Sequence, residues 1–255
     1  MDLRVIGCHG GETPKHRTSA FVLDDRLAID AGSLTSGMDL KAQCALKACL
    51  VSHAHLDHIR DLATIADNRA QNGCAPLVIA GTKQTIAILK KHFFNDLLWP
   101  DFSRIPTPEK PAIEYLVLKP EVPTNVAGYT VRAILVSHTI ETCAFVVEGR
   151  DGAIGYSGDT GPTKRMWEVL NETPNLRALL MEVSFPDSEQ DVATVSGHHT
   201  PRTLAPELLK YKSPKDLPTL LYHIKPVFQA KVEREVARIK GVNLTVLQLG
   251  DQFIL

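Results

Sequence analysis

The sequence predicts an α/β fold in which two related halves pack their β-sheets face to face and carry helices on the outer surfaces. Short runs of β-branched residues alternate with helix-like stretches along the whole chain. Residues 20–23 and 144–147 also share an Ala-Phe-Val pattern, and each leads through an acidic turn to an Asp-x-Gly segment, at Asp30 and Asp159. Chance is the alternative, since hairpins with acidic turns are common. If the likeness reflects structure, both Asp-x-Gly segments lie at one site.

The order of the elements follows from periodicity and turn residues. The expected strands are residues 3–6, 19–23, 26–29, 48–51, 77–79, 115–118, 129–136, 144–147, 153–156, 179–183, 219–222 and 244–249. The expected helices are residues 56–72, 83–92, 162–171, 201–210 and 226–239; the last three begin with proline, whose missing N–H costs nothing in a first turn. We expect a single domain over residues 1–255, with halves at about 1–125 and 126–255.

Proline is frequent between residues 99 and 123, which predicts an ordered surface loop between the halves. Phe93, Phe94, Trp99 and Phe102 flank this loop. These aromatic side chains could form a wall against an aromatic ligand or a dimer contact. Plain packing of the loop on the body of the protein is the interpretation we favour.

Composition excludes several classes of protein. The chain has 255 residues and a formal net charge of −1, whereas capture of long nucleic acid or of an anionic membrane would need a basic surplus. It contains no apolar run of about 18 residues and no apolar leader, so we expect a cytoplasmic enzyme with no membrane partner. The five cysteines form no C-x-x-C pair, which predicts reduced thiols rather than disulfides or a structural zinc site.

The most informative segment follows an apolar, strand-like run and reads His53-Ala54-His55-Leu56-Asp57-His58. Core packing gives no reason to place three histidines and an aspartate so close together. Imidazole and carboxylate groups are preferred ligands for zinc and similar divalent ions. In an extended segment His53 and His55 point to the same side, and Asp57 and His58 turn toward a neighbouring direction as a helix begins. One segment could therefore serve two ions about 3.5 to 4 Å apart.

This segment resembles the metal-binding motif of the metallo-β-lactamase superfamily, whose fold is a four-layer αββα sandwich of two similar halves. The resemblance implies further site residues. His138 matches the third histidine of the superfamily, Asp159 the aspartate that bridges both metals, and His223 the last histidine. Asp30 matches the buried aspartate that orients a ligand histidine from behind.

Within the superfamily the chain most resembles the class II cyclic nucleotide phosphodiesterases. The shared segments are, in chain order, His53-Ala54-His55-Leu56-Asp57-His58-Ile59, Glu182-Val183-Ser184-Phe185, Gly197-His198-His199-Thr200-Pro201 and His223-Ile224-Lys225-Pro226. They span most of the chain. One departure follows Ile59, where the family pattern has a small residue, an apolar run and a serine, and this chain has Arg60-Asp61. The departure bears on the substrate and leaves the metal motif intact.

The resemblance implies a metal-dependent phosphodiesterase that opens 3′,5′-cyclic AMP or GMP to the 5′-monophosphate. Two divalent metal ions are the expected cofactors, zinc first, with manganese or iron as alternatives. Such ions lower the pKa of bound water from 15.7 to about 7 and neutralise phosphoryl oxygens. One ion would be held by His53, His55, His138 and Asp159, and the other by Asp57, His58, Asp159 and His223.

The catalytic residues implied by the resemblance are His198, Glu182 and Asp57. His198 would protonate the departing alkoxide, as a general acid worth about 10²- to 10⁴-fold in rate. Glu182 would bond the far ring nitrogen of His198, fix its tautomer and keep the ring protonated. The alternative is that His198 is a loop residue before a helix that Thr200 caps.

Three further residues are candidates for contact with the substrate. Gly10 and Gly11 would let the backbone approach the metals, and Lys225 could meet a phosphate oxygen. The expected partner is a small phosphodiester, and the chain could be a monomer or a homodimer.

One alternative function is that of the zinc-dependent tRNA 3′-processing endonucleases, which usually carry a tRNA-gripping arm that is absent here. The others are a thioester, lactone or β-lactam hydrolase and a non-catalytic binding protein.

Overall fold

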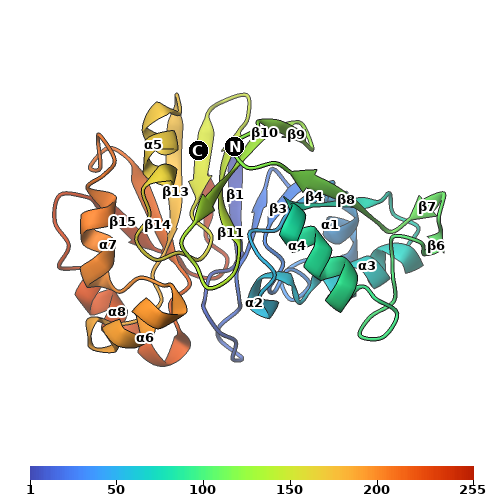
Figure 1. Ribbon diagram of the computed structural model, residues 1–255, viewed down its shortest axis with the longest axis horizontal. Helices are drawn as coiled ribbons and strands as arrows, with labels where there is room; N and C mark the ends of the chain where they lie inside the picture. Colours follow the sequence, from blue (N-terminus) through green and yellow to red (C-terminus); the bar gives the residue numbers. More distant parts are fainter.

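Two seven-stranded β-sheets form the centre of the computed structural model, which describes residues 1–255 (Figure 1). The first sheet has the order β16 (Gln252–Ile254), β1 (Asp2–Gly7), β2 (Ala20–Leu23), β3 (Leu27–Ile29), β4 (Ala48–Leu50), β5 (Leu77–Thr82) and β8 (Ile113–Leu118). The second has the order β9 (Thr124–Val126), β10 (Tyr129–Val136), β11 (Thr142–Glu148), β12 (Ala153–Tyr156), β13 (Leu176–Glu182), β14 (Pro218–Tyr222) and β15 (Asn243–Val246).

The two sheets have the same pattern of strand directions. Along the orders given above, the first three neighbouring pairs are antiparallel and the next three are parallel in both sheets. The hairpin β2–β3 thus corresponds to the hairpin β11–β12, the two stretches whose sequences are alike. The likeness therefore reflects structure and not chance. One strand breaks the division into halves, because β16, from the end of the chain, pairs with β1 in the first sheet.

Apolar side chains fill three layers of core. On β2, Phe21 and Leu23 point between the sheets, whereas Ala20 and Val22 point toward the helices, as expected for alternating side chains. The outer face of the first sheet packs on α1 (Leu40–Ala45), α3 (Leu62–Gln71) and α4 (Lys83–Ile88), and that of the second on α5 (Arg165–Glu172), α7 (Pro201–Leu208) and α8 (Gln229–Val236). The predicted four-layer αββα sandwich is confirmed. No helix combines the length and apolar character that a membrane span requires.

Several element boundaries differ from the expected ones. The helix expected at 56–72 is divided into α2 (Leu56–Ile59) and α3, because the Asp61 N–H donates to the Ala31 carbonyl (2.8 Å). The helix expected at 83–92 is α4 followed by a π-helical turn, Leu89–Phe93, and that at 226–239 is a 3₁₀ turn, Pro226–Phe228, before α8. The short elements α1, α6 (Gln190–Ser196), the 3₁₀ turn Asp187–Glu189, β9 and β16 were not expected.

The proline-rich segment 99–123 contains a small hairpin of β6 (Pro106–Thr107) and β7 (Lys110–Pro111) and then β8, so it is not a loop throughout. Phe93, Phe94 and Phe102 are buried in the core beneath it, which confirms the packing interpretation over a ligand wall. Trp99 is partly exposed and donates from its indole nitrogen to the Ala63 carbonyl (3.1 Å).

Cys44 and Cys74 form a disulfide, so the expectation of five reduced cysteines is wrong for this pair. Packing of the first helical layer brings their Cα atoms to 5.5 Å, within the range for a disulfide, although the residues lie 30 positions apart. Cys8, Cys49 and Cys143 are buried free thiols, as expected.

Candidate metal centre

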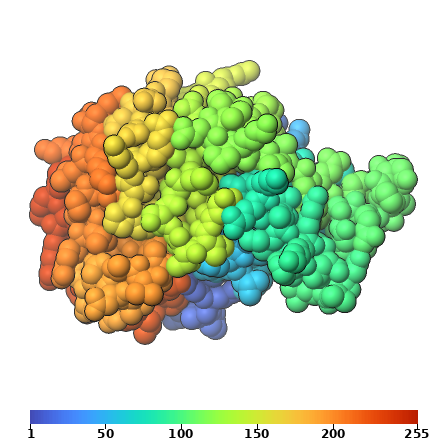
Figure 2. Space-filling model, viewed as in Figure 1, coloured from blue at the N-terminus to red at the C-terminus, as the bar shows by residue number.

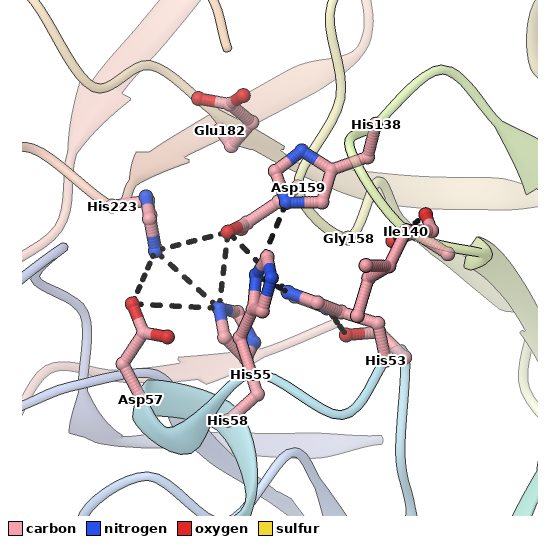
Figure 3. Close-up of polar contacts among 12 residues, drawn as sticks. His53, His55, Asp57, His58, His138, Ile140, Gly158, Asp159, Glu182 and His223 are labelled. Carbon is pink, nitrogen blue, oxygen red and sulfur yellow. Dashed lines mark hydrogen bonds and ion pairs between the residues drawn. The ribbon is translucent and has the colours of Figure 1, made fainter. Parts of the chain in front are cut away.

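The predicted site residues converge at one edge of the sandwich, where strands of both sheets end. Carboxyl ends of neighbouring parallel strands open onto a common crevice, which is where α/β sheets bind ligands. The residues at these ends are Asp30 after β3, His53 after β4, His138 after β10, Asp159 after β12, Glu182 at the end of β13 and His223 after β14. Figure 3 shows most of these side chains pointing toward one another from loops of both halves.

Three histidines form the first donor group. The His55 Nδ1 atom lies 3.0 Å from His53 Nε2 and 3.3 Å from His138 Nε2. Their ligand atoms all lie within 4.8 Å of one another. His53 and His138 come from different sheets, so only the folded sandwich brings these nitrogens together.

Asp57, His58, Asp159 and His223 form the second donor group. Asp159 Oδ2 lies 3.2 Å from both His58 Nε2 and His223 Nε2, and 3.8 Å from His53 Nε2. Asp57 Oδ2 lies 3.3 Å from His223 Nε2 (Figure 3). Asp159 therefore faces both donor groups, which is the position expected of a bridging ligand.

Asp30 lies behind the donor groups and makes four hydrogen bonds. It accepts from His58 Nδ1 (2.6 Å), from the Ser52 N–H and hydroxyl (2.8 Å each) and from the Tyr156 hydroxyl (2.6 Å). The Ser52 hydroxyl in turn accepts from His53 Nδ1 (3.0 Å). Asp30 thus orients His58 directly and His53 through Ser52. Because Asp159 also contacts His58, both Asp-x-Gly segments meet at one imidazole.

A second carboxylate–serine–histidine chain lies in the other half. The Ser184 hydroxyl donates to Glu182 Oε2 (3.1 Å) and accepts from His223 Nδ1 (2.8 Å). β4 and β13 occupy equivalent places in the two sheets, and each is followed by Val-Ser, at Ser52 and Ser184. Ser52, Ser184 and Tyr156 were missed by sequence reasoning. The repeated Val-Ser pair was the available signal for the two serines.

The donor groups fit divalent metal ions. His138 directs Nδ1 at the Gly197 carbonyl, so its neutral ring turns the Nε2 lone pair inward. His58 directs Nδ1 at Asp30, which leaves Nε2 facing the same space. Burial lowers the pKa of His53, His55, His138 and His223, which favours the neutral, metal-binding form. Converging lone pairs repel one another unless a cation lies between them. The buried Asp159 Oδ1 atom also has no hydrogen-bond partner.

His58 differs from the other histidines. Burial lowers its pKa, but the carboxylates of Asp159 and Asp30 outweigh that effect and raise it well above the usual value. His223, His58 and His53 likewise overcome the effect of burial and hold the pKa of Asp159 well below its usual value. Asp159 and Asp30 therefore stabilise a positive charge at His58, and a cation bound beside Asp159 would supply such a charge in place of a proton.

Glu182 and His198 lie directly beside the second donor group. His198 Nδ1 is 3.1 Å from Glu182 Oε1, and its ring stacks on that of His223 with centroids 5.1 Å apart. Nε2 of His198 has no hydrogen-bond partner in the protein. Burial lowers the pKa of His198 and raises that of Glu182 to about 7. Both shifts favour the neutral forms of the pair, a neutral imidazole beside a carboxylic acid.

The surrounding backbone is locally strained. Asp30 and His223 adopt positive φ angles of 56° and 73°, which residues other than glycine rarely do. Gly10 lies so close to His223 that a Cβ would collide with its carbonyl oxygen. Gly11 packs against Pro226, where a Cβ would lie 3.1 Å from the ring. The glycines therefore permit the close approach of the first loop to His223.

The other predicted residues have varied surroundings. Lys225 Nζ donates to the Gly10 carbonyl (2.7 Å) and is only partly buried. Thr200 caps α7 with Pro201 at the first position, as expected. His199 is fully buried, with Nδ1 3.0 Å from the Thr203 hydroxyl, and it belongs to neither donor group.

The chain belongs to the beta-lactamase superfamily, since the sequence model of the beta-lactamase superfamily domain matches residues 33–224. The recognised family is therefore confirmed. A 3′,5′-cyclic-nucleotide phosphodiesterase of Aliivibrio fischeri is 29% identical, over 100% of this chain and 90% of that protein. The crystal structure of unliganded yeast PDE1 matches with a TM-score of 0.84 and 19% identity, covering 100% of this chain and 99% of that one. The short form of human tRNase Z matches with a TM-score of 0.69 and 17% identity, covering 100% and 99%.

Proposed function

We propose that the chain is a dinuclear metal-dependent phosphodiesterase that hydrolyses 3′,5′-cyclic nucleotides, cyclic AMP first and cyclic GMP second, to 5′-monophosphates. The observation that carries the proposal is the position of Asp159 between two groups of inward-facing donors, next to the Glu182–His198 pair. The activity named for the Aliivibrio fischeri relative supports the same substrate class.

The donor sets suit two divalent ions. His53, His55, His138 and Asp159 would hold one, and Asp57, His58, Asp159 and His223 the other. Bound there, zinc or a similar ion would supply Lewis acidity, which neutralises the phosphoryl oxygens and makes water a nucleophile near neutral pH. Asp57 is only partly buried, so it borders the space where substrate would enter.

The Glu182–His198 pair supplies the proton that the leaving oxygen needs. As water attacks phosphorus and releases one of its protons to solvent, the P–O3′ bond breaks. His198 gives its Nε2 proton to O3′ while Nδ1 takes one from Glu182, and Glu182 regains a proton from solvent afterwards. The 3.1 Å contact between His198 Nδ1 and Glu182 Oε1 allows this transfer and holds the ring in place. The remaining Glu182 oxygen is bound by Ser184, which keeps the carboxylate from rotating.

Two measurements test the proposal together. Purified protein should contain close to two divalent ions per chain by elemental analysis. A product assay should then compare 3′,5′-cyclic nucleotides, 2′,3′-cyclic nucleotides, a bis-aryl phosphodiester and precursor tRNA. We expect cleavage of the 3′,5′-cyclic nucleotides to 5′-monophosphates and no cleavage of precursor tRNA. Cleavage of precursor tRNA alone, or full activity after stringent chelation, would refute the proposal.

A further inference from the structure

A cleft of about 690 Å³ opens beside the metal donors, between the loop at residues 10–16 and residues 185 and 225–228. Small-molecule sites usually occupy about 300 to 1,000 Å³, so its size suits a compact ligand. In Figure 2 the blue N-terminal residues and the orange residues of the second half adjoin at the lower edge of the molecule.

The cleft begins at the catalytic residues proposed above. The ring of Phe185, on one wall, lies 5.9 Å from that of His198 and 6.1 Å from that of Phe228. On the other wall the Gly10 N–H donates to the Ile224 carbonyl (3.0 Å), directly after His223. A substrate whose phosphate lies at the donor groups would therefore extend its remaining part into this cleft.

The walls of the cleft suit a flat ring with polar edges. Phe185 and Phe228 are half-buried and give one wall two aromatic rings. Gly10 and Gly11 contribute backbone and no side chain to the facing wall. Glu12 and His16, at the rim, offer a carboxylate and an imidazole to hydrogen-bonding edges. Aromatic stacking with polar groups at the rim is how proteins hold single nucleobases.

The loop that closes the cleft is held in a defined conformation. Thr13 and His16 exchange two backbone hydrogen bonds of 3.1 Å. Glu12 forms an ion pair with Arg60, whose guanidinium also donates to the Ser33 hydroxyl (3.2 Å). Arg60 is the residue at which the chain departs from the class II pattern. It ties the loop to the end of α2 and so holds the cleft wall in place.

We propose that this cleft binds the nucleobase of the cyclic nucleotide, stacked on Phe185 and Phe228, while the phosphate lies at the donor groups. The inference rests on the proposed function and adds the residues that recognise the base. It predicts that the enzyme distinguishes a nucleotide from the same cyclic phosphate without a base.

The test compares cyclic AMP with methyl ribofuranoside 3′,5′-cyclic phosphate, which has the same phosphodiester and no base. The Phe228→Ala variant should lose about 5- to 150-fold in kcat/KM on cyclic AMP, because base stacking on an aromatic side chain is worth that much. Its kcat/KM on the abasic phosphate should fall by no more than about two-fold, so the preference for cyclic AMP is lost. Phe228→Tyr should restore the preference, and Phe228→Leu, which fills the space without an aromatic face, should not.

Equal losses on both substrates, or a full preference retained by Phe228→Leu, would overturn the cleft assignment while leaving the phosphodiesterase intact. Failure of the wild-type protein to cleave either cyclic phosphate would instead refute the proposed function. Metal content and the thermal unfolding midpoint of each variant identify a loss of activity caused by misfolding. If Phe228→Ala misfolds, the comparison of Phe228→Leu with Phe228→Tyr decides the cleft assignment.

Discussion

At the scale of single residues, two serines connect buried carboxylates to histidines of the two donor groups. Ser52 stands between Asp30 and His53, and Ser184 between Glu182 and His223. A hydroxyl that donates to a carboxylate leaves its lone pairs for the histidine Nδ1–H, so it fixes which nitrogen faces the metal. Ser52 contacts a histidine of the first donor group and Ser184 one of the second, so the effects of replacing the two serines should be separable.

Replacing either serine with alanine should weaken one ion more than the other. Ser52→Ala should lower affinity at the group that contains His53, and Ser184→Ala at the group that contains His223, each by about 10- to 100-fold. Competition with a coloured chelator measures the two affinities, and Ser188→Ala, an exposed serine on the same half, serves as the control. Equal weakening of both ions by both variants would contradict separate roles.

His198→Ala should separate chemistry from metal binding. The variant should keep its metal content, because every member of the two donor groups remains in place, yet lose about 10²- to 10⁴-fold in turnover of cyclic AMP. Metal analysis and steady-state kinetics on the same preparation check both points. The acid assignment fails if His198→Ala is fully active and His199→Ala is the crippled variant.

At the scale of elements, local patterns were predictable and tertiary contacts were not. The strand that leads into His53 and the capped helix after His198 follow from periodicity and capping residues, which act over a few positions. The division between α2 and α3 depends on the Ala31 carbonyl, which is remote in sequence from Asp61. Ser184 gains its role from His223, 39 residues away, so its contact did not follow from local periodicity, and the repeated Val-Ser pair was the available signal.

The turn after β12 should be far less tolerant of substitution than an open turn. Gly158 and Gly73 both have φ of 60°, but a Cβ at Gly158 would lie 2.7 Å from the Cys143 carbonyl, whereas one at Gly73 meets nothing within 4 Å. Gly73→Ala should cost about 1 to 2 kcal/mol of unfolding free energy from backbone strain alone. Gly158→Ala should cost a further 1 to 3 kcal/mol or so from the clash.

Urea denaturation of both glycine variants measures the difference. Gly158→Ala should also lose metal affinity, because any shift of the turn moves Asp159, whereas Gly73→Ala should not. Indistinguishable urea midpoints for the two variants would show that the turn relaxes without cost.

At the scale of the whole molecule, the internal likeness predicted the paired sheets, and the resemblance to a family predicted the layers. Neither predicted that β16 joins the first sheet. Its three residues are too few for a periodic signal, and its partner β1 lies at the other end of the chain. The Leu255 N–H also donates to the Met1 carbonyl (2.8 Å), so the first and last residues of the chain are hydrogen-bonded at this edge of the sheet.

Deleting residues 252–255 should expose the edge of β1. We expect a loss of about 2 kcal/mol or more in unfolding free energy, since Phe253 and Leu255 pack on the core between the sheets. The open edge should also promote association. Urea midpoints and size-exclusion chromatography check both effects. Ile254→Ala is the matched control, because that side chain is 81% exposed and its backbone pairing persists. An unchanged midpoint after the deletion would mean that β16 contributes nothing.

The spread of the donors along the chain has a consequence during biosynthesis. His53, His55 and His58 leave the ribosome while Asp159 and His223 are still to be made. The nascent polypeptide therefore carries three imidazole ligands before the complete metal site can form. Divalent copper and nickel bind imidazole more tightly than manganese or iron do. The metal recovered with the enzyme should therefore depend on which ions surround the growing polypeptide, and refolding in defined ion mixtures would reveal that dependence.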